Sequence, residues 1–181
     1  MSKKKRIPDL HYLYEASVQG VGTDIDFAVR IFKKKNGRKP NTLREDFCGT
    51  AALACEWVKR SPQHCAWGVD IDQPTLDWGL KHNVPHIGEN AGPLNLLCDD
   101  VLKAKTPAAD LVMALNFSYC VFKTRDRLRT YFKQVRKALK KDGLFIMDIY
   151  GGTEAVATKS EPRKVASFTA ADGTQVPSFT Y

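Results

Sequence analysis

The chain has 181 residues, of which 43% are hydrophobic and 27% are charged, and its formal net charge is +8. This composition excludes a disordered chain, and the length suits one domain with a substantial core. No apolar run is long enough to cross a bilayer, and the basic N-terminus lacks the apolar stretch of a secretory signal.

The five cysteines are odd in number, and no two of them form a CxxC pair. A disulfide framework or a zinc site is therefore not expected, and a reducing, cytoplasmic setting is favoured. The excess of Lys and Arg would suit an anionic partner such as RNA. These residues concentrate at 3–6, 30–39 and 123–141, runs that could equally be solvated tails and helix faces.

Helical and extended patterns alternate along the chain. A short N-terminal helix around Tyr12 is followed by a helix at 24–35, which Asp24 could cap and Gly37 could end. Thr124 and Gly143 are expected to cap and to end the last helix. The remaining pattern predicts strands at 42–47, 64–72, 94–101, 109–117 and 143–152, and helices at 50–60, 73–83 and 124–141.

Strands that alternate with helices predict an α/β fold, doubly wound around a mostly parallel sheet in three layers. Ligands in such sheets bind beyond the carboxyl ends of the strands, where the strand order reverses. Polar residues stand there after four of the predicted strands, at 45–51, 70–72, 99–100 and 116–119.

The residue types at these strand ends suit an adenosine. Backbone N–H groups of Cys48, Gly49 and Thr50, at a helix N-terminus, can contact a carboxylate. Asp70 could accept hydrogen bonds from both hydroxyls of a ribose. Asp99 could accept from the exocyclic amino group of adenine, with its neighbour Asp100 as the competing choice.

Five stretches together resemble the successive motifs of class I S-adenosylmethionine-dependent methyltransferases: "LREDFCGTAALA", "GVDIDQPTLDWG", "LLCDDVL", "ADLVMALNFSYCVF" and "LKKDGLFIMDIYGG". The resemblance covers about residues 10–152. It implies a Rossmann-like methyltransferase fold, S-adenosylmethionine as cofactor, no metal, and methyl transfer to an unidentified small-molecule, protein or RNA acceptor.

The resemblance also implies roles for single residues. Glu45 stands at the family's first-strand acid, Gly49 at the middle glycine of its loop, and Asp70 at the ribose-binding acid. Asp99 stands at the adenine-reading residue. The implied cofactor-binding set is completed by Tyr14, Cys48, Thr50, Ile71, Asp100, Val101 and Asn116.

The sequence departs from the family at the loop that is usually Gly-x-Gly-x-Gly. Phe47 and Ala51 occupy the two outer glycine places. The bulk of Phe47 changes how closely the loop can approach the cofactor. It leaves open whether Glu45 or Asp46 faces the methionyl amino group.

A narrower resemblance concerns the acceptor. Asn116 and Tyr119 match the first and last residues of the Asn/Asp-Pro-Pro-Tyr motif of some amino-group methyltransferases, and the two prolines are missing. The match implies catalytic roles for Asn116 and Tyr119. Alternatively, Asn116 ends a strand while Tyr119 packs beneath the cofactor. Related enzymes often carry an aromatic residue in an N-terminal lid, so Tyr14 or Gln19 could reach into the cofactor pocket. Simple surface packing of this helix is the alternative.

We expect a single methyltransferase domain over 1–181, with a helical lid at 1–40 and the cofactor-binding core at 41–152. The segment 153–181 holds an Asp172-Gly173 turn signal, which predicts a short hairpin. It is too short for the last two strands of a seven-stranded sheet, so a shortened C-terminus is expected. An uncovered sheet edge could then pair with another chain as a homodimer, and activity could be reduced.

Two other functions fit parts of the same pattern. A nicotinamide-dependent oxidoreductase would use a related fold, but its Gly-x-Gly-x-x-Gly signature is poorly matched. A basic RNA-binding module could use the fold without catalysis. Binding of S-adenosylhomocysteine, of NADH or of RNA alone distinguishes the three.

Overall fold

A computed structural model describes residues 9–18, 20–152, 155, 157–158 and 160–181 of the chain. It divides into a larger unit, residues 20–151, and a smaller unit formed by the described parts of 1–19 and 152–181. Among the described residues, no helix is both long enough and apolar enough to span a membrane. The basic run at 3–6 and the lid candidate Gln19 lie outside the described residues.

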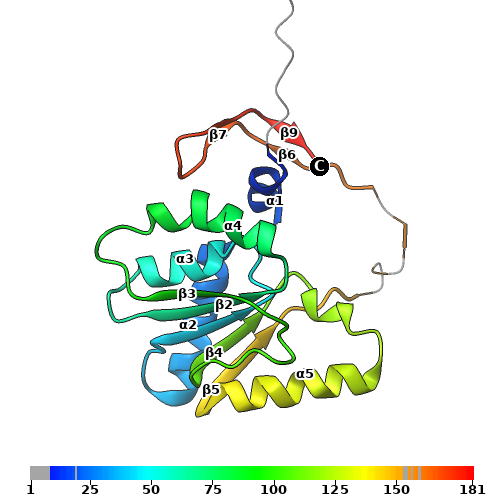
Figure 1. The fold of residues 1–181 in the computed structure, drawn as a ribbon. Helices are drawn as coiled ribbons and strands as arrows, with labels where there is room; N and C mark the ends of the chain where they lie inside the picture. Colours follow the sequence, from blue (N-terminus) through cyan, green and yellow to red (C-terminus); the bar gives the residue numbers. More distant parts are fainter. Residues whose placement is uncertain (1–8, 19, 153–154, 156, 159) are drawn as a thin grey trace, which may run out of the picture. The chain divides into compact units, whose positions relative to one another are not determined.

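The larger unit is built on a five-stranded parallel sheet (Figure 1). Its strands lie in the order β3-β2-β1-β4-β5, so the strand order reverses between β1 and β4. The predicted doubly wound α/β fold is confirmed. The strands are β1 (Thr42–Asp46), β2 (Cys65–Asp70), β3 (Leu94–Cys98), β4 (Ala109–Ala114) and β5 (Leu139–Met147).

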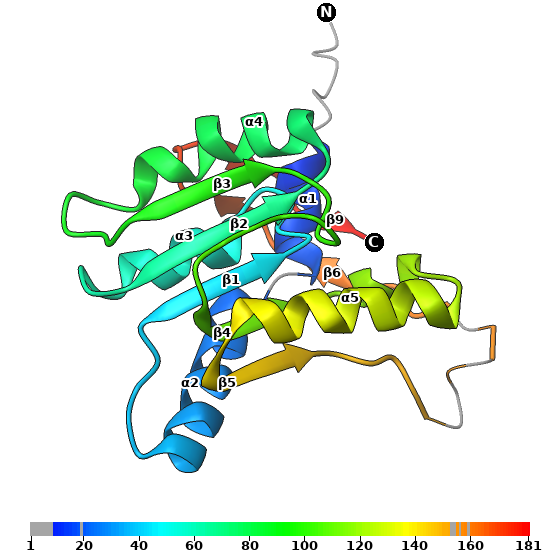
Figure 2. The same cartoon turned by 60° about the horizontal axis from the view of Figure 1, so that its bottom comes forward.

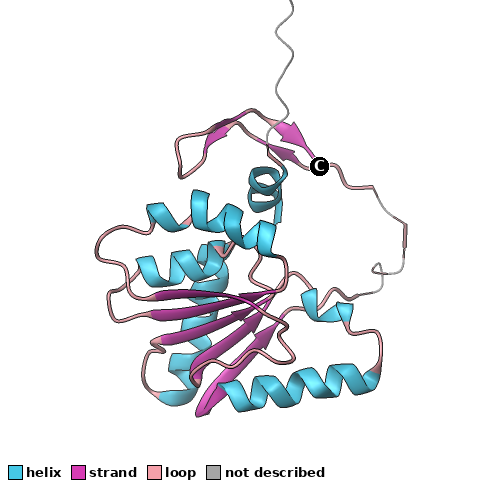
Figure 3. Ribbon diagram, in the orientation of Figure 1, coloured by secondary structure: helices cyan, strands magenta, loops and turns pink. Residues whose placement is uncertain are grey.

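Helices cover both faces of this sheet (Figure 3). One face is covered by α2 (Val21–Asn36), α3 (Ala52–Lys59) and α4 (Gln73–His82), and the other by α5 (Arg125–Ala138). Short 3-10 turns, η1 (Val84–His86) and η2 (Ser118–Val121), follow α4 and β4.

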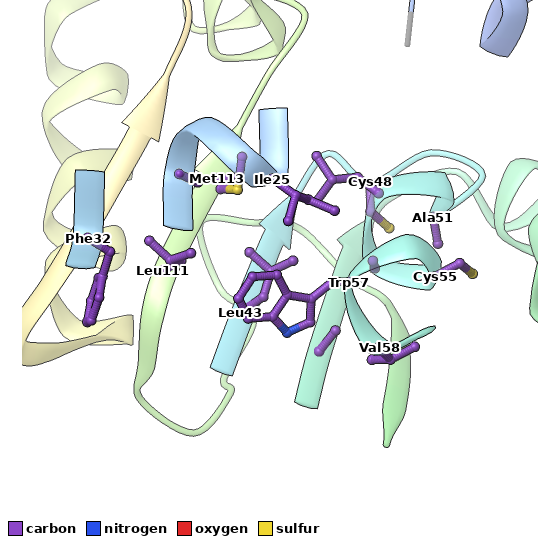
Figure 4. Close-up of a cluster of buried hydrophobic side chains, with 14 of the residues drawn as sticks. Ile25, Phe32, Leu43, Cys48, Ala51, Cys55, Trp57, Val58, Leu111 and Met113 are labelled. Carbon is purple, nitrogen blue, oxygen red and sulfur yellow. The ribbon is translucent and has the colours of Figure 1, made fainter. Parts of the chain in front are cut away.

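Two hydrophobic clusters hold the helices to the sheet. On the three-helix face, Ile25 and Phe32 of α2 and Trp57 of α3 are completely buried against the strands (Figure 4). On the other face, Tyr131 and Val135 of α5 pack against β4. Burial of each large side chain stabilises the fold by roughly 1.5–3 kcal/mol. All six residues of β4 are buried, as expected for a strand covered on both faces.

The predicted helix boundaries can be compared with the structure. Gly37 ends α2 in the left-handed conformation, with φ of 70°, and donates its N–H to the Lys33 carbonyl. Thr124 accepts a hydrogen bond from the Arg127 N–H, so it caps α5 as predicted. The predicted cap of α2 is wrong, because that helix begins at Val21 and Asp24 lies in its first turn.

The predicted end of the last helix at Gly143 is also wrong. The helix ends at Ala138, and Leu139 is already extended, with φ of −96° and ψ of 138°. Leu139 pairs with Ala109, so the parallel ladder between β5 and β4 begins there. Lys140 forms an ion pair with the buried carboxylate of Asp110 at 3.1 Å. Pairing in the sheet therefore overrides the helical pattern of these residues.

The smaller unit contains α1 (Leu10–Val18), β6 (Lys164–Val165), β7 (Phe168–Thr169), β8 (Gln175–Val176) and β9 (Phe179–Thr180). β7 pairs with β8 and β6 with β9, both antiparallel. Gly173 lies in the turn between β7 and β8 with φ of 83°, which confirms the predicted hairpin. The Tyr12 hydroxyl donates to Asp172, and the Tyr181 hydroxyl donates to the Ser17 carbonyl at 2.8 Å.

Candidate active site

The loop that follows β1 adopts an unusual backbone. Phe47, Gly49 and Ala51 all have left-handed φ angles, of 60°, 53° and 59°. Each non-glycine residue in this conformation costs about 1–2 kcal/mol. Phe47 and Ala51 thus adopt the geometry for which the resemblance leads us to expect glycine. The Phe47 ring offsets part of this cost, since it packs 5.7 Å from the ring of Tyr131 and 5.9 Å from that of Phe122.

Asp70, at the end of β2, holds this loop in place. Its Oδ2 accepts the Gly49 N–H at 2.8 Å, and its Oδ1 accepts the Asp72 N–H at 2.9 Å. The Cys48 N–H donates to the Val69 carbonyl at 3.1 Å. Each carboxylate oxygen has a second lone pair, so Asp70 can still accept hydrogen bonds from a ligand.

Glu45 and Asp46 are neighbours in β1, and their side chains therefore lie on opposite faces of the sheet. Both oxygens of Asp46 have buried partners: the Arg44 Nε at 2.7 Å and the Tyr131 hydroxyl at 2.9 Å. Glu45 accepts the Ala54 N–H, at the start of α3, at 3.0 Å. Burial raises the pKa of Glu45 to about 8, and the carboxylate of Asp70 contributes to this shift. Glu45 is thus mostly protonated at neutral pH.

A pocket of about 170 Å³ lies beyond the ends of β2 and β3. Its wall is mainly apolar, and Asp99 and Asp100 contribute carboxylates. The Asp99 N–H donates to the Asp70 carbonyl at 2.9 Å, which ties the two strand ends together. The lining residues are Phe47, Ile71, Asp99, Asp100, Val101, Val121, Phe122 and Arg127. Sequence reasoning missed Val121 and Arg127, which carry no signal of their own.

Arg44 connects this pocket to the interior of the sheet. It is 1% exposed, and its guanidinium donates to the carbonyls of Val101 at 3.3 Å and Ala104 at 3.1 Å. One buried side chain thus joins the loop after β3 to Asp46 in β1. This residue was also missed, although Arg44 and Asp46 are two apart in a strand and therefore share a face.

The loop after β4 is the second place with a strained backbone. Asn116 and Phe117 have left-handed φ angles of 55° and 57°. Both N–H groups donate to the carboxylate of Asp148 at 2.9 Å, just after β5. The charge of Asp148 is also felt by Asp24 in the first turn of α2. Burial raises the pKa of Asp24, and the charge of Asp148 raises it further. Asp148 was missed, although the rule of a carboxylate after a strand applies to it too.

No protein-family model matches this chain, and no curated protein matches it. Solved structures do match. The sugar N-methyltransferase KedS8 from Streptoalloteichus sp ATCC 53650 is 13% identical, with a TM-score of 0.65 over 93% of this chain and 63% of that one. An S-adenosylmethionine-dependent methyltransferase from Clostridium acetobutylicum ATCC 824 is 19% identical, with a TM-score of 0.67 over 94% of this chain and 77% of that one.

CalS10, an amino pentose methyltransferase from Micromonospora echinaspora, is 13% identical and has a TM-score of 0.66 over 91% of this chain and 65% of that one. The chain has the Rossmann-like fold of S-adenosylmethionine-dependent methyltransferases. At such identities the likeness concerns the fold. The chain spans 63% of KedS8 and 50% of the plantazolicin methyltransferase BpumL.

On this methyltransferase fold, most of the predicted site residues lie at the carboxyl ends of three adjacent strands. They are Glu45, Cys48, Gly49, Thr50, Asp70, Ile71, Asp99, Asp100 and Val101. The side chains of Cys48 and Thr50 are 2% and 3% exposed and so have little surface left for a ligand.

The two predicted catalytic residues follow β4. Asn116 is exposed, whereas the Tyr119 side chain is 9% exposed and belongs to the hydrophobic cluster under α5. Their catalytic roles stay predictions. Tyr14 lies on α1 in the smaller unit, so its role as a lid residue also stays a prediction.

Proposed function

We propose that the chain binds S-adenosylmethionine at the carboxyl ends of β1, β2 and β3 and transfers its methyl group to an acceptor. The observation that carries this proposal is that Glu45, Asp70 and Asp99 end three adjacent parallel strands, and that Asp99 lines an apolar pocket at this edge of the sheet. Among the similar structures, CalS10 was solved with S-adenosylmethionine and BpumL with S-adenosylhomocysteine.

The residues present fit the chemical parts of this cofactor. An apolar pocket lined by Ile71, Val101 and Phe122, with Asp99 at its wall, suits a flat base that carries an amino group. The lone pairs left on Asp70 suit a ribose. Asp46 is committed to Arg44 and Tyr131, which favours Glu45 as the partner of the methionyl amino group. The positive charge of that group would lower the raised pKa of Glu45 and favour its carboxylate form. When bound, the cofactor supplies a methyl group already activated on a sulfonium.

The protein's main task in such a reaction is to hold the acceptor in line with the methyl carbon and the sulfur. Positioning of this kind can contribute roughly 7–11 kcal/mol. We assign it to Asn116 and Tyr119, the residues that follow β4, with Asp148 holding the Asn116 backbone. A base is required only where the acceptor atom must lose a proton first.

Calorimetric titration with S-adenosylhomocysteine tests the binding step. We expect the wild-type chain to bind it, and Asp70→Ala to weaken binding more than tenfold, since hydrogen bonds to charged groups are worth about 1.5–3 kcal/mol. Asp77→Ala is the matched control, because Asp77 is an exposed acid on α4. Binding of NADH instead of S-adenosylhomocysteine would overturn the proposed cofactor. Equal affinity of Asp70→Ala and Asp77→Ala for S-adenosylhomocysteine would remove Asp70 from the site.

The acceptor requires a separate screen. KedS8 and CalS10 are described as a sugar N-methyltransferase and an amino pentose methyltransferase, which favours small amines as the first class to test. Transfer of labelled methyl groups to amines, protein and RNA would identify the class. Loss of transfer in Asn116→Ala, with unchanged affinity for S-adenosylhomocysteine, is the result expected of an acceptor-positioning residue.

A further inference from the structure

A second pocket, of about 240 Å³, lies between the loop after β3 and the C-terminal half of α5. It shares no lining residue with the candidate cofactor pocket. Its lining residues are Arg44, Lys103, Ala104, Lys105, Thr106, Gln134, Lys137 and Ala138, and no carboxylate is among them.

The charge in this pocket comes from Lys103, Lys105 and Lys137. All three are exposed, and within the described part of the chain no carboxylate lies within ion-pair distance of them. Arg44 adds no net charge, because Asp46 neutralises it. Three unpaired ammonium groups around one hollow create a positive potential that attracts an anion.

The backbone of the pocket is also arranged to tolerate an anion. The Ala104 carbonyl, which would otherwise repel negative charge, accepts a hydrogen bond from Arg44 at 3.1 Å. The Thr106 hydroxyl and the half-buried Gln134 amide add polar groups that can bond to phosphate oxygens or to a hydroxyl. The hollow therefore combines cations with neutral hydrogen-bonding groups.

A row of cations on α5 leads to this pocket. Arg125, Arg129, Lys133 and Lys137 are spaced four residues apart, which places them along one side of the helix. The row is about 18 Å long, with steps of about 6 Å that an extended phosphodiester chain can match. All four side chains are exposed, and Arg129 forms a solvent-exposed ion pair with Asp126 at 3.5 Å. Figure 2 shows α5 lying lengthwise along its face of the sheet.

We propose that this row and pocket form a binding surface for single-stranded RNA, with one phosphate held by Lys103, Lys105 and Lys137. A lone phosphate would need only the pocket, whereas the row continues the same charge over several phosphate positions. Thr106 and Gln134 can contact the ribose 2′-hydroxyl, the group that distinguishes RNA from DNA. The surface is separate from the proposed methyl-transfer site and does not depend on it.

Fluorescence anisotropy with a labelled 15-nucleotide RNA tests this proposal, in the absence of any cofactor and over a range of KCl concentrations. The test variant is Lys103→Gln/Lys105→Gln/Lys137→Gln. The control is Lys33→Gln/Lys34→Gln/Lys35→Gln, which removes the same charge from exposed positions on α2. Calorimetry with S-adenosylhomocysteine runs in parallel, so that failure of the cofactor site is seen separately.

We expect the pocket variant to bind RNA at least tenfold more weakly than the wild type at 50 mM KCl. Its log–log salt slope should be smaller by about 0.7, since the variant loses one phosphate contact and each such contact on a single strand contributes about 0.7. The control should lose less than threefold. Equal losses of RNA affinity in both variants would show that net charge alone accounts for binding and would refute the surface. Absence of RNA binding by the wild type at 50 mM KCl would refute it as well. Equal affinity for DNA of the same sequence would overturn the choice of RNA.

Discussion

Replacing Glu45 by Gln should stabilise the larger unit at neutral pH. The folded chain holds Glu45 with its pKa raised to about 8, against an ordinary value of 4.5, mainly because the carboxyl is buried. The stability that this group contributes is fully present below pH 4.5, where both states are protonated. It is lost as the pH rises toward 8, because the unfolded chain then releases a proton that the folded chain retains.

The size of this effect follows from the pH interval. Each pH unit between 4.5 and 7 costs about 1.4 kcal/mol, so the wild type loses up to about 3 kcal/mol by pH 7. Gln is uncharged over this range, and its amide oxygen can still accept the Ala54 N–H. We therefore expect Glu45→Gln to unfold like the wild type at pH 5 to within about 1 kcal/mol, and to exceed it by about 3–4 kcal/mol at pH 7.5.

Urea unfolding followed by tryptophan fluorescence measures this difference. The three tryptophans, Trp57, Trp67 and Trp78, all lie in the larger unit, so the signal reports that unit. Glu89→Gln, at an exposed position, is the control and should follow the wild type at both pH values. A Glu45→Gln difference that is the same at pH 5 and pH 7.5 would refute the raised pKa.

Two further substitutions test the contacts that support the site. Arg44→Met leaves Asp46 buried without its cation, and we expect about 3–5 kcal/mol less unfolding free energy in urea; a loss below 1 kcal/mol would contradict this role. Gly79→Ala directs its new Cβ at the backbone carbonyl of Thr50, so α4 must shift. We expect it to cost about 1–3 kcal/mol and to weaken binding of S-adenosylhomocysteine, and unchanged thermal unfolding and affinity would show that the contact is unimportant.

The sheet and the strand-end carboxylates could be predicted because they depend on local patterns. Apolar runs followed by an acid identify the strands, and parallel strands bring their carboxyl ends to one edge. The end of α5 could not be predicted this way, because the pairing of Leu139 with Ala109 depends on residues 30 positions apart in the chain. Nor could the pattern show that the Asp148 carboxylate binds the loop after β4.

The left-handed conformation of the loop after β1 shows what a family resemblance can predict about a backbone and what it cannot. The family's three glycine places fall on the three residues with left-handed φ angles, yet Phe47 and Ala51 occupy two of those places here. The packing that compensates Phe47 involves Phe122 and Tyr131, from elements far along the chain. Such compensation is a property of the folded core and has no local signature.

A crystal structure of the full chain with S-adenosylhomocysteine tests the central proposal most directly. The account predicts the adenine in the pocket lined by Ile71, Asp99 and Val101, the ribose hydroxyls on the Asp70 carboxylate, and the amino group beside Glu45. Ligand density elsewhere on the molecule, with this pocket filled only by water at saturating ligand, would contradict it.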